Sequence, residues 1–322
     1  MIMPTVTSVH PEQILKDLRE LWASLGHDQV DGGVLRACSM TLAVTAGDDA
    51  DTDSVRQTLG VLMHSHPSRA MIVRDVPNAA EMNAHIFSEC WKPFGSSQQI
   101  CSEGIEITPG HGALDEVARF IVPLRAPDLP VVLWRRGALG RDNRRFEGLL
   151  ALADKVIFDT FDTPDAAGAV GYLRGLQTSG RRVADLNWTR LTGWREVVAH
   201  LFDDAAVSAD DVTAVNIAHG GGRMTTSALY FASWIRSALP SAPVIVDAVS
   251  APAHQPGGLV SIEFTTPTDH LTLRQTEFGC VEVTGAGRNY HTALPPVRVE
   301  DLMREELGIL GPDRVFERVL AA

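Results

Sequence analysis

The sequence predicts an α/β protein of two domains, each with a mixed sheet flanked by helices, and with an antiparallel meander near the C-terminus. Short, fully apolar runs such as Val131–Trp134 are typical of buried strands, and they alternate along the chain with amphipathic helical patterns. From Gly258 onward the pattern changes to apolar–polar alternation, which is typical of antiparallel strands. A length of 322 residues, at roughly 150 residues per domain, gives two domains.

The first domain, residues 1–160, is predicted to open with an amphipathic helix over 11–25, because apolar residues recur there at helical spacing after a proline. A strand, a helix and a second strand then form a βαβ unit, and two alternating segments predict an antiparallel pair joined by the turn region 92–95. The expected elements are strands over 38–45, 69–76, 84–91, 99–108, 131–134 and 155–159, and helices over 52–64 and 115–124.

The second domain, residues 161–322, repeats the alternation of helices and strands and then changes character. Helices are expected over 166–176, 193–202 and 224–239, and strands over 212–218 and 244–249. Three alternating segments between 258 and 285 predict the meander, and helices over 299–307 and 314–321 close the chain.

Composition excludes several classes of function. The net charge of −12 disfavours a dedicated nucleic-acid binder, because a polyanion would be repelled. Cys38, Cys90, Cys101 and Cys280 have neither CxxC spacing nor the density of a disulfide scaffold, so we expect buried, unpaired thiols in a reducing cytoplasm. No leader-like start and no run of 18 apolar residues is present, so export and membrane insertion are not expected.

An arginine-rich loop follows the buried strand that ends at Trp134, and strand ends carry ligand sites in α/β folds. Its basic residues are Arg135, Arg136, Arg141, Arg144 and Arg145. We expect this loop to meet an acidic partner surface or to hold a phosphosugar; the alternative is a solvated loop whose arginines pair with nearby acids.

A second cluster, DLNWTRLTGWRE, contains Trp188, Arg190, Trp194 and Arg195, which are the residue types most enriched at interface hot spots. The alternative is that the tryptophans belong to the core, and we favour this for Trp194.

A predicted glycine loop, formed by His219, Gly220, Gly221 and Gly222, precedes Arg223 and a helix, an order that suits an anion. It matches neither dinucleotide nor P-loop spacing, and a connecting loop is the other interpretation.

Catalytic motifs are missing from the sequence. There is no GxSxG, no HExxH and no cysteine beside an activating histidine, and His64 and His66 lack further ligands at metal spacing. We therefore expect neither an enzyme nor a metal or cofactor site.

Several segments in order along the chain carry a resemblance, the most specific being VPLRAPDLPVVLWRRG (122–137) and DLNWTRLTGWREVVAHLFD (185–203). With them the chain resembles the OpcA family of glucose-6-phosphate dehydrogenase assembly proteins. The resemblance implies a non-catalytic bacterial cytoplasmic protein that binds this dehydrogenase, favours its active oligomer and so serves the oxidative pentose phosphate pathway. Cyanobacterial members are associated with redox control through cysteines, but the absence of a close cysteine pair argues against thiol switching here. The competing hypothesis is a sugar-phosphate-binding enzyme or sensor that uses the glycine loop and the arginine cluster.

Overall fold

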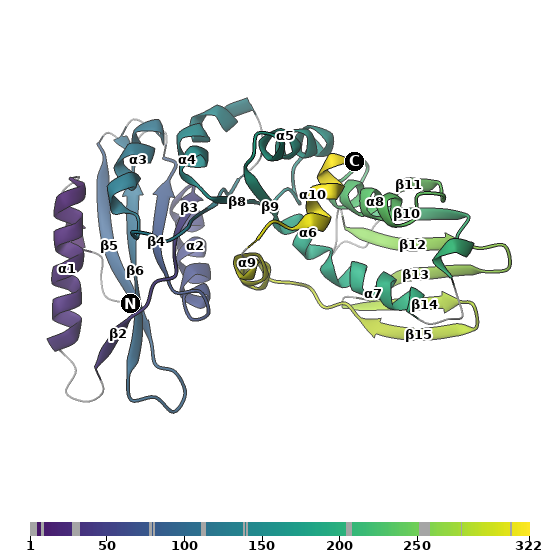
Figure 1. The fold of residues 1–322 in the computed structure, drawn as a ribbon, viewed down its shortest axis with the longest axis horizontal. Helices are drawn as coiled ribbons and strands as arrows, with labels where there is room; N and C mark the ends of the chain where they lie inside the picture. The colour runs from purple at the N-terminus through teal and green to yellow at the C-terminus, as the bar shows by residue number, and fades with distance from the viewer. Residues whose placement is uncertain are drawn as a thin grey trace. The chain divides into compact units, whose positions relative to one another are not determined.

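The computed structural model describes residues 5–7, 10–27, 33–76, 79, 81–110, 114–137, 139, 141–203, 208–250, 258–277, 279–309 and 311–322. The chain divides into two compact units, 1–158 and 159–322, each with its own sheet and helices (Figure 1). The predicted α/β class with a C-terminal antiparallel meander is confirmed.

The sheet of the first unit has the order β1-β5-β6-β4-β3-β7-β8, with β2 paired to β6 beside this path. The central strands β6, β4, β3, β7 and β8 are parallel, whereas β5 is antiparallel to β6 and β1 to β5. β3 and β7 are buried along their whole length, which explains their uninterrupted apolar sequences. The strands are β1 Thr5–Thr7, β2 Val34–Arg36, β3 Met40–Ala46, β4 Ser68–Arg74, β5 Asn83–Trp91, β6 Gln99–Thr108, β7 Val131–Trp134 and β8 Lys155–Phe158.

The α-helices among the described residues of this unit are α1 Pro11–His27, α2 Asp49–Leu62, α3 Leu114–Ile121 and α4 Glu147–Leu152. α2 links the parallel strands β3 and β4, as the predicted βαβ unit requires. Glu103 and Glu106 lie three residues apart on β6 and therefore point to opposite faces of the sheet. Trp22 of α1 donates to Glu103 and Arg56 of α2 donates to Glu106, so the two helices cover opposite faces.

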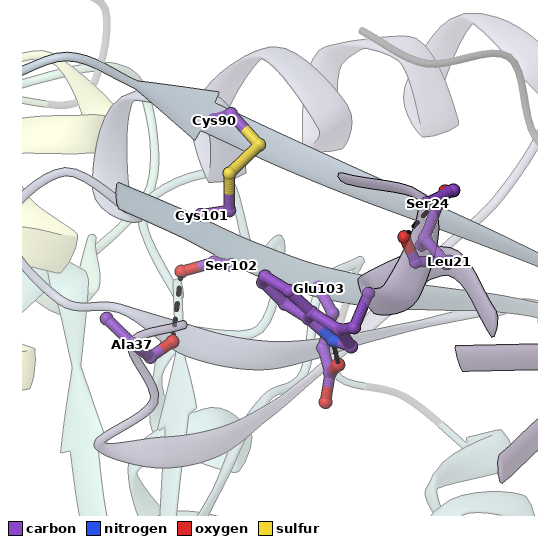
Figure 2. Close-up of a disulfide and its surroundings, with 8 residues drawn as sticks. Leu21, Ser24, Ala37, Cys90, Cys101, Ser102 and Glu103 are labelled. Carbon is purple, nitrogen blue, oxygen red and sulfur yellow. Dashed lines mark hydrogen bonds between the residues drawn. A yellow bond between two sulfur atoms is a disulfide. The ribbon is translucent and has the colours of Figure 1, made fainter. Parts of the chain in front are cut away.

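The expectation of unpaired cysteines is wrong for Cys90 and Cys101, which form a disulfide (Figure 2). They are 11 residues apart in sequence but directly opposite each other in the antiparallel register of β5 and β6. Their spacing resembles no cysteine motif, and only the hairpin register brings the sulfurs together. Cys38 and Cys280 are free thiols, as expected.

The sheet of the second unit has the order β11-β10-β12-β13-β14-β15, in which only β10 and β11 are parallel. The meander contains four strands, one more than predicted, because β14 and β15 are joined by the two-residue turn Ala286–Gly287. Both turn residues have positive φ, as a type I′ hairpin turn requires, but Ala-Gly is not its usual sequence. The strands of this sheet are β10 Ala214–Gly220, β11 Val244–Val249, β12 Leu259–Thr265, β13 His270–Glu277, β14 Cys280–Gly285 and β15 Arg288–Ala293, and the short strand β9 Arg182–Asp185 lies outside it.

Helices α8 and α7 supply apolar faces to this unit, and α8 connects the parallel strands β10 and β11. β9 and the single-turn helix α6 carry the start of the DLNWTRLTGWRE segment; neither was predicted, because both are too short for a periodic pattern. The helices are α5 Ala166–Thr178, α6 Leu186–Arg190, α7 Thr192–Phe202, α8 Thr226–Ala238, α9 Val299–Gly308 and α10 Arg314–Ala321.

Candidate functional site

The carboxyl ends of the parallel strands β3, β4 and β7 meet at a small cavity of about 300 Å³ in the first unit. Open α/β sheets bind their ligands at this edge. The cavity is lined by residues that directly follow these strands, including Gly47, Asp75 and Arg136, and by Arg145 from the following loop. The arginine-rich loop therefore lies where its sequence position predicted.

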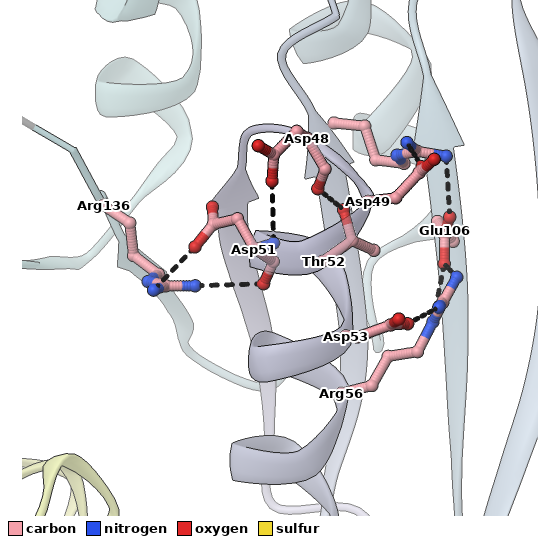
Figure 3. A network of polar contacts seen from close by, with 9 residues as sticks. Asp48, Asp49, Asp51, Thr52, Asp53, Arg56, Glu106 and Arg136 are labelled. Carbon is pink, nitrogen blue, oxygen red and sulfur yellow. Dashed lines mark hydrogen bonds and ion pairs between the residues drawn. The ribbon is translucent and has the colours of Figure 1, made fainter.

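The arginines at this edge are bound by the protein's own acceptors. Arg136 forms an ion pair of 2.8 Å with Asp51 (Figure 3). Its guanidinium also lies over the ring of Trp134. Arg145 forms an ion pair of 2.7 Å with Asp75. These pairs place positive charge on the strand ends and neutralise it at the same place.

Arg135 is buried and is not part of a solvated loop. Its Nη1 donates to the carbonyl oxygens of Arg136 and Gly137 at 2.6 Å each, and its guanidinium lies 4.4 Å from the centroid of the Phe146 ring. Trp134 is also buried. Arg144 is exposed, and Arg141 lies in a short 3₁₀ turn over 141–146 with its side chain outside the described part of the structure.

The first turn of α2 occupies the position where dinucleotide-binding folds place a glycine-rich phosphate loop. Here the turn after β3 reads Gly47-Asp48-Asp49-Ala50-Asp51, and Asp48 caps the helix by accepting from the backbone N–H of Asp51 at 2.9 Å. Figure 3 shows the carboxylates of Asp48, Asp49 and Asp51 around the start of α2. The positive end of the helix is thus already neutralised by acidic side chains, which oppose the approach of a phosphate.

In the second unit the DLNWTRLTGWRE segment begins with a buried hydrogen-bond network. The Asp185 carboxylate accepts from the hydroxyls of Thr160 at 2.6 Å and Tyr230 at 2.7 Å and from two backbone N–H groups. Burial raises the pKa of Asp185 above its ordinary value, because it outweighs these hydrogen bonds, which lower the pKa. Burial and the neighbouring Asp185 also raise the pKa of Tyr230. The network extends through Asn187, which donates to Thr226 at 2.6 Å.

The tryptophans of this segment belong to the core, which confirms the interpretation favoured for Trp194. Trp188 is 1% exposed, stacks on Phe316 and donates from its indole nitrogen to Asp313 at 2.9 Å. Arg195 lies 3.6 Å over the ring of Trp188, and burial lowers the pKa of its guanidinium. These tryptophans and Arg195, whose residue types are typical of interface hot spots, therefore form an internal framework of the second unit.

Arg190 is half-buried and forms a bidentate pair with Asp159 at 2.9 and 3.2 Å. Like Arg195, the other arginine of its segment, it is engaged within its own unit.

The framework borders a cavity of about 690 Å³ in the second unit. Asn187, Thr189 and Ser227 form its buried polar wall, while Trp194 and Tyr290 contribute aromatic surface. Glu305 lies at the same cavity, and burial raises the pKa of its carboxyl. Sequence reasoning missed this site because α8, β15 and α9, which complete its walls around α6 and α7, are distant from these two helices in the sequence.

The glycine loop has a different structure from the predicted one. His219 and Gly220 are the last residues of β10 rather than part of a loop, because β10 pairs with β11 as far as Gly220. Gly221 has φ +94°, Gly222 and Arg223 are exposed, and the N-terminus of α8 is capped by Thr225.

These features define a two-domain α/β protein whose strand-end site is filled with internal ion pairs and whose most distinctive segment is a buried framework. Two domain families match the chain: the glucose-6-phosphate dehydrogenase subunit N-terminal domain over residues 60–175 and the corresponding C-terminal domain over residues 181–320. The chain belongs to the OpcA family, which confirms the resemblance carried by its sequence.

Curated relatives carry the name OxPP cycle protein OpcA. That of Nostoc punctiforme is 31% identical over 153 residues, which is 46% of this chain and 32% of the relative, and that of Synechocystis is 25% identical over 264 residues, 69% and 55%. The matches thus span about a third to about half of the relatives' length.

Among solved structures, a 3-ketoreductase from Actinomadura kijaniata with NADP has a TM-score of 0.48 at 11% identity, covering 87% of this chain and 93% of that one. An NAD-binding oxidoreductase from Klebsiella pneumoniae has a TM-score of 0.49 at 9% identity, with 88% and 94% coverage. At these values neither an activity nor a cofactor carries over.

Two further observations bear on the class of protein. No helix in the described part of the chain is both long and apolar enough to cross a bilayer. Within the same residues, no group of three histidine, cysteine or acidic side chains is arranged to hold a metal ion.

Proposed function

We propose that the protein is a non-catalytic assembly factor that binds glucose-6-phosphate dehydrogenase in the cytoplasm of a bacterium and favours its active oligomer. The observation that carries the proposal is the match of both halves of the chain to domains described as parts of a glucose-6-phosphate dehydrogenase subunit. Membership of the family associates the chain with this enzyme and with the oxidative pentose phosphate cycle.

The strand-end site supports a role without nicotinamide chemistry. A dinucleotide would place its pyrophosphate at the N-terminus of α2, where Asp48, Asp49 and Asp51 stand and where Arg136 is held by Asp51. Binding there would require phosphate to approach carboxylates and to break an ion pair.

Activation by assembly requires a difference in affinity between two forms of the enzyme. A partner shifts an oligomer equilibrium only by as much as it prefers one state over the other. A coupling of about 1–3 kcal/mol would change the ratio of active to inactive oligomer by a factor of about 5–150.

The test combines the purified chain with glucose-6-phosphate dehydrogenase from the same cell. Light scattering after gel filtration measures the mass of the complex, and NADPH formation measures the rate. We expect a new species that contains both proteins and a saturable increase in the dehydrogenase rate, while the chain alone produces no NADPH. Separate elution together with an unchanged rate would refute the proposal.

A sugar phosphate remains the second candidate ligand, because Arg223 and two glycines are exposed beside β10. Calorimetry with glucose 6-phosphate and 6-phosphogluconate on the isolated chain distinguishes this sensor function from assembly. Binding that Arg223→Ala abolishes would favour the sensor.

A further inference from the structure

The hairpin that joins β5 to β6 carries an exposed aromatic residue at its tip. Phe94 is 108% exposed, so its whole ring faces solvent, and it follows Lys92-Pro93 in the connecting turn. Figure 1 shows this hairpin projecting beyond β2 at the end of the first unit. An exposed phenylalanine forfeits the stabilisation of burial, which amounts to roughly 1.5–3 kcal/mol for a side chain of this size.

The same end of the sheet carries further apolar side chains in one row. Leu35 of β2 is opposite Ile100 of β6, and Ile100 is opposite Trp91 of β5, so the three side chains share one face. Leu35 is 51% exposed, and Trp91 and Ile100 are half-buried. We call Leu35, Trp91, Phe94 and Ile100 the hairpin patch.

The loop at the tip of the hairpin carries one positive charge. Residues 90–102 contain Lys92 and no carboxylate, in a chain with a net charge of −12. Glu89 and Glu103 flank this segment, and Glu103 is buried and paired with Arg36 and Arg69. The loop itself therefore presents a positive charge, which favours an acidic partner surface over a basic one at this end of the sheet.

The disulfide fixes the conformation of the hairpin. Cys90 and Cys101 close the loop that contains Phe94. They are the cross-strand pair next to Trp91–Ile100, one residue farther from the loop. His64 of the turn after α2 packs on Trp91 with ring centroids 4.9 Å apart. A loop held in one conformation loses less entropy on binding than a free one, which strengthens binding without adding a contact.

We propose that the hairpin patch is the surface through which this protein docks onto its dehydrogenase partner, with Phe94 inserted into an apolar pocket bordered by carboxylates. This inference rests on the proposed function and adds the location and chemistry of the interface. Large aromatic anchors at the centre of an interface supply most of its binding energy, and a disulfide-held hairpin presents such an anchor rigidly.

The test measures the affinity of the full-length chain for the dehydrogenase by surface plasmon resonance. We expect Phe94→Ala to weaken binding roughly tenfold or more, because truncation of a central aromatic anchor has effects of this size. Lys92→Glu should weaken it by about threefold to tenfold through charge repulsion. Ile245→Ala, which truncates an exposed apolar side chain on β11 of the second unit, and Lys16→Glu, which changes an exposed lysine on α1, are the matched controls and should bind like the wild type.

A Cys90→Ser/Cys101→Ser variant tests the role of the disulfide, and we expect it to bind roughly threefold or more weakly than the wild type. The Phe94 side chain is fully exposed to solvent, so its truncation should not impair folding. An unchanged thermal melt of Phe94→Ala verifies this. If the wild type does not bind the enzyme, the proposed function fails. If the wild type binds and folded Phe94→Ala binds equally well, the interface lies elsewhere and the inference is overturned.

Discussion

Replacement of the buried Glu103 by glutamine should destabilise the first unit more than any comparable change at its surface. The Glu103 carboxylate is 2% exposed and accepts from Arg69 Nε at 2.6 Å, from Arg36 at 2.6 Å and from the indole of Trp22. Arg69 is itself buried and donates to the carbonyl oxygen of Leu124 at 2.8 Å. Glu103→Gln keeps the shape of the side chain and leaves the Arg69 charge without its counter-ion.

Breaking one member of a buried ion pair costs about 3–5 kcal/mol, because the remaining charge is neither hydrated nor paired. For a unit of this size each kcal/mol lowers the midpoint of thermal unfolding by about 2–4 °C, so we expect a shift of roughly 6–20 °C. Urea unfolding followed by circular dichroism at pH 7 measures the same loss as a lower midpoint with an unchanged slope.

The pH dependence gives a second signature. Burial would raise the pKa of Glu103, but Arg69, the Trp22 indole and Arg36 outweigh burial and hold it below its ordinary value. A carboxylate with a lowered folded-state pKa contributes stability above its unfolded-state pKa and loses it as the pH falls through the folded-state pKa. The gap between wild type and variant should therefore be full at pH 7 and shrink below about pH 4.

Glu282→Gln is the matched control, since Glu282 is also paired with an arginine, Arg274, but on an exposed part of β14. We expect its unfolding midpoint to equal that of the wild type. Equal midpoints for Glu103→Gln and Glu282→Gln at pH 7 would contradict the assignment of the Glu103 cluster as a buried, stabilising ion pair.

Three further predictions follow from the same structure. Tyr230→Phe removes a donor from the buried Asp185 carboxylate and should lower the unfolding free energy by about 1–3 kcal/mol in urea titrations; an unchanged midpoint would show that Asp185 is satisfied without it. The unreduced, denatured chain should titrate two thiols, Cys38 and Cys280, and four after reduction, whereas four from the start would exclude the disulfide. NADP⁺ at millimolar concentration should give no binding heat with the wild type, because Asp48 and Asp51 occupy the phosphate position; saturable binding would contradict this.

The sequence by itself determined the α/β class, the long strands and, among the described residues, the helices of eight or more residues, but not the shorter α4 and α6. Runs such as Val131–Trp134 and the alternation after Gly258 report burial directly, since the faces a strand buries dictate which of its residues are apolar. The family was also readable from the sequence, because its two most specific segments, 122–137 and 185–203, supply the buried strand β7 and a buried framework, whose packing constrains the residues at their buried positions.

Tertiary structure alone decided the roles of the arginines, tryptophans and cysteines. Residue type does not distinguish an arginine that binds a partner protein from one that forms an ion pair with Asp51. It also does not distinguish a tryptophan at an interface from Trp188 in the core, because the local sequence is compatible with either role. The register of β5 and β6 paired Cys90 with Cys101 and left Phe94 exposed beyond them. Contacts between residues distant in sequence depend on how strands align and helices pack, so they cannot be predicted from a local pattern of residues.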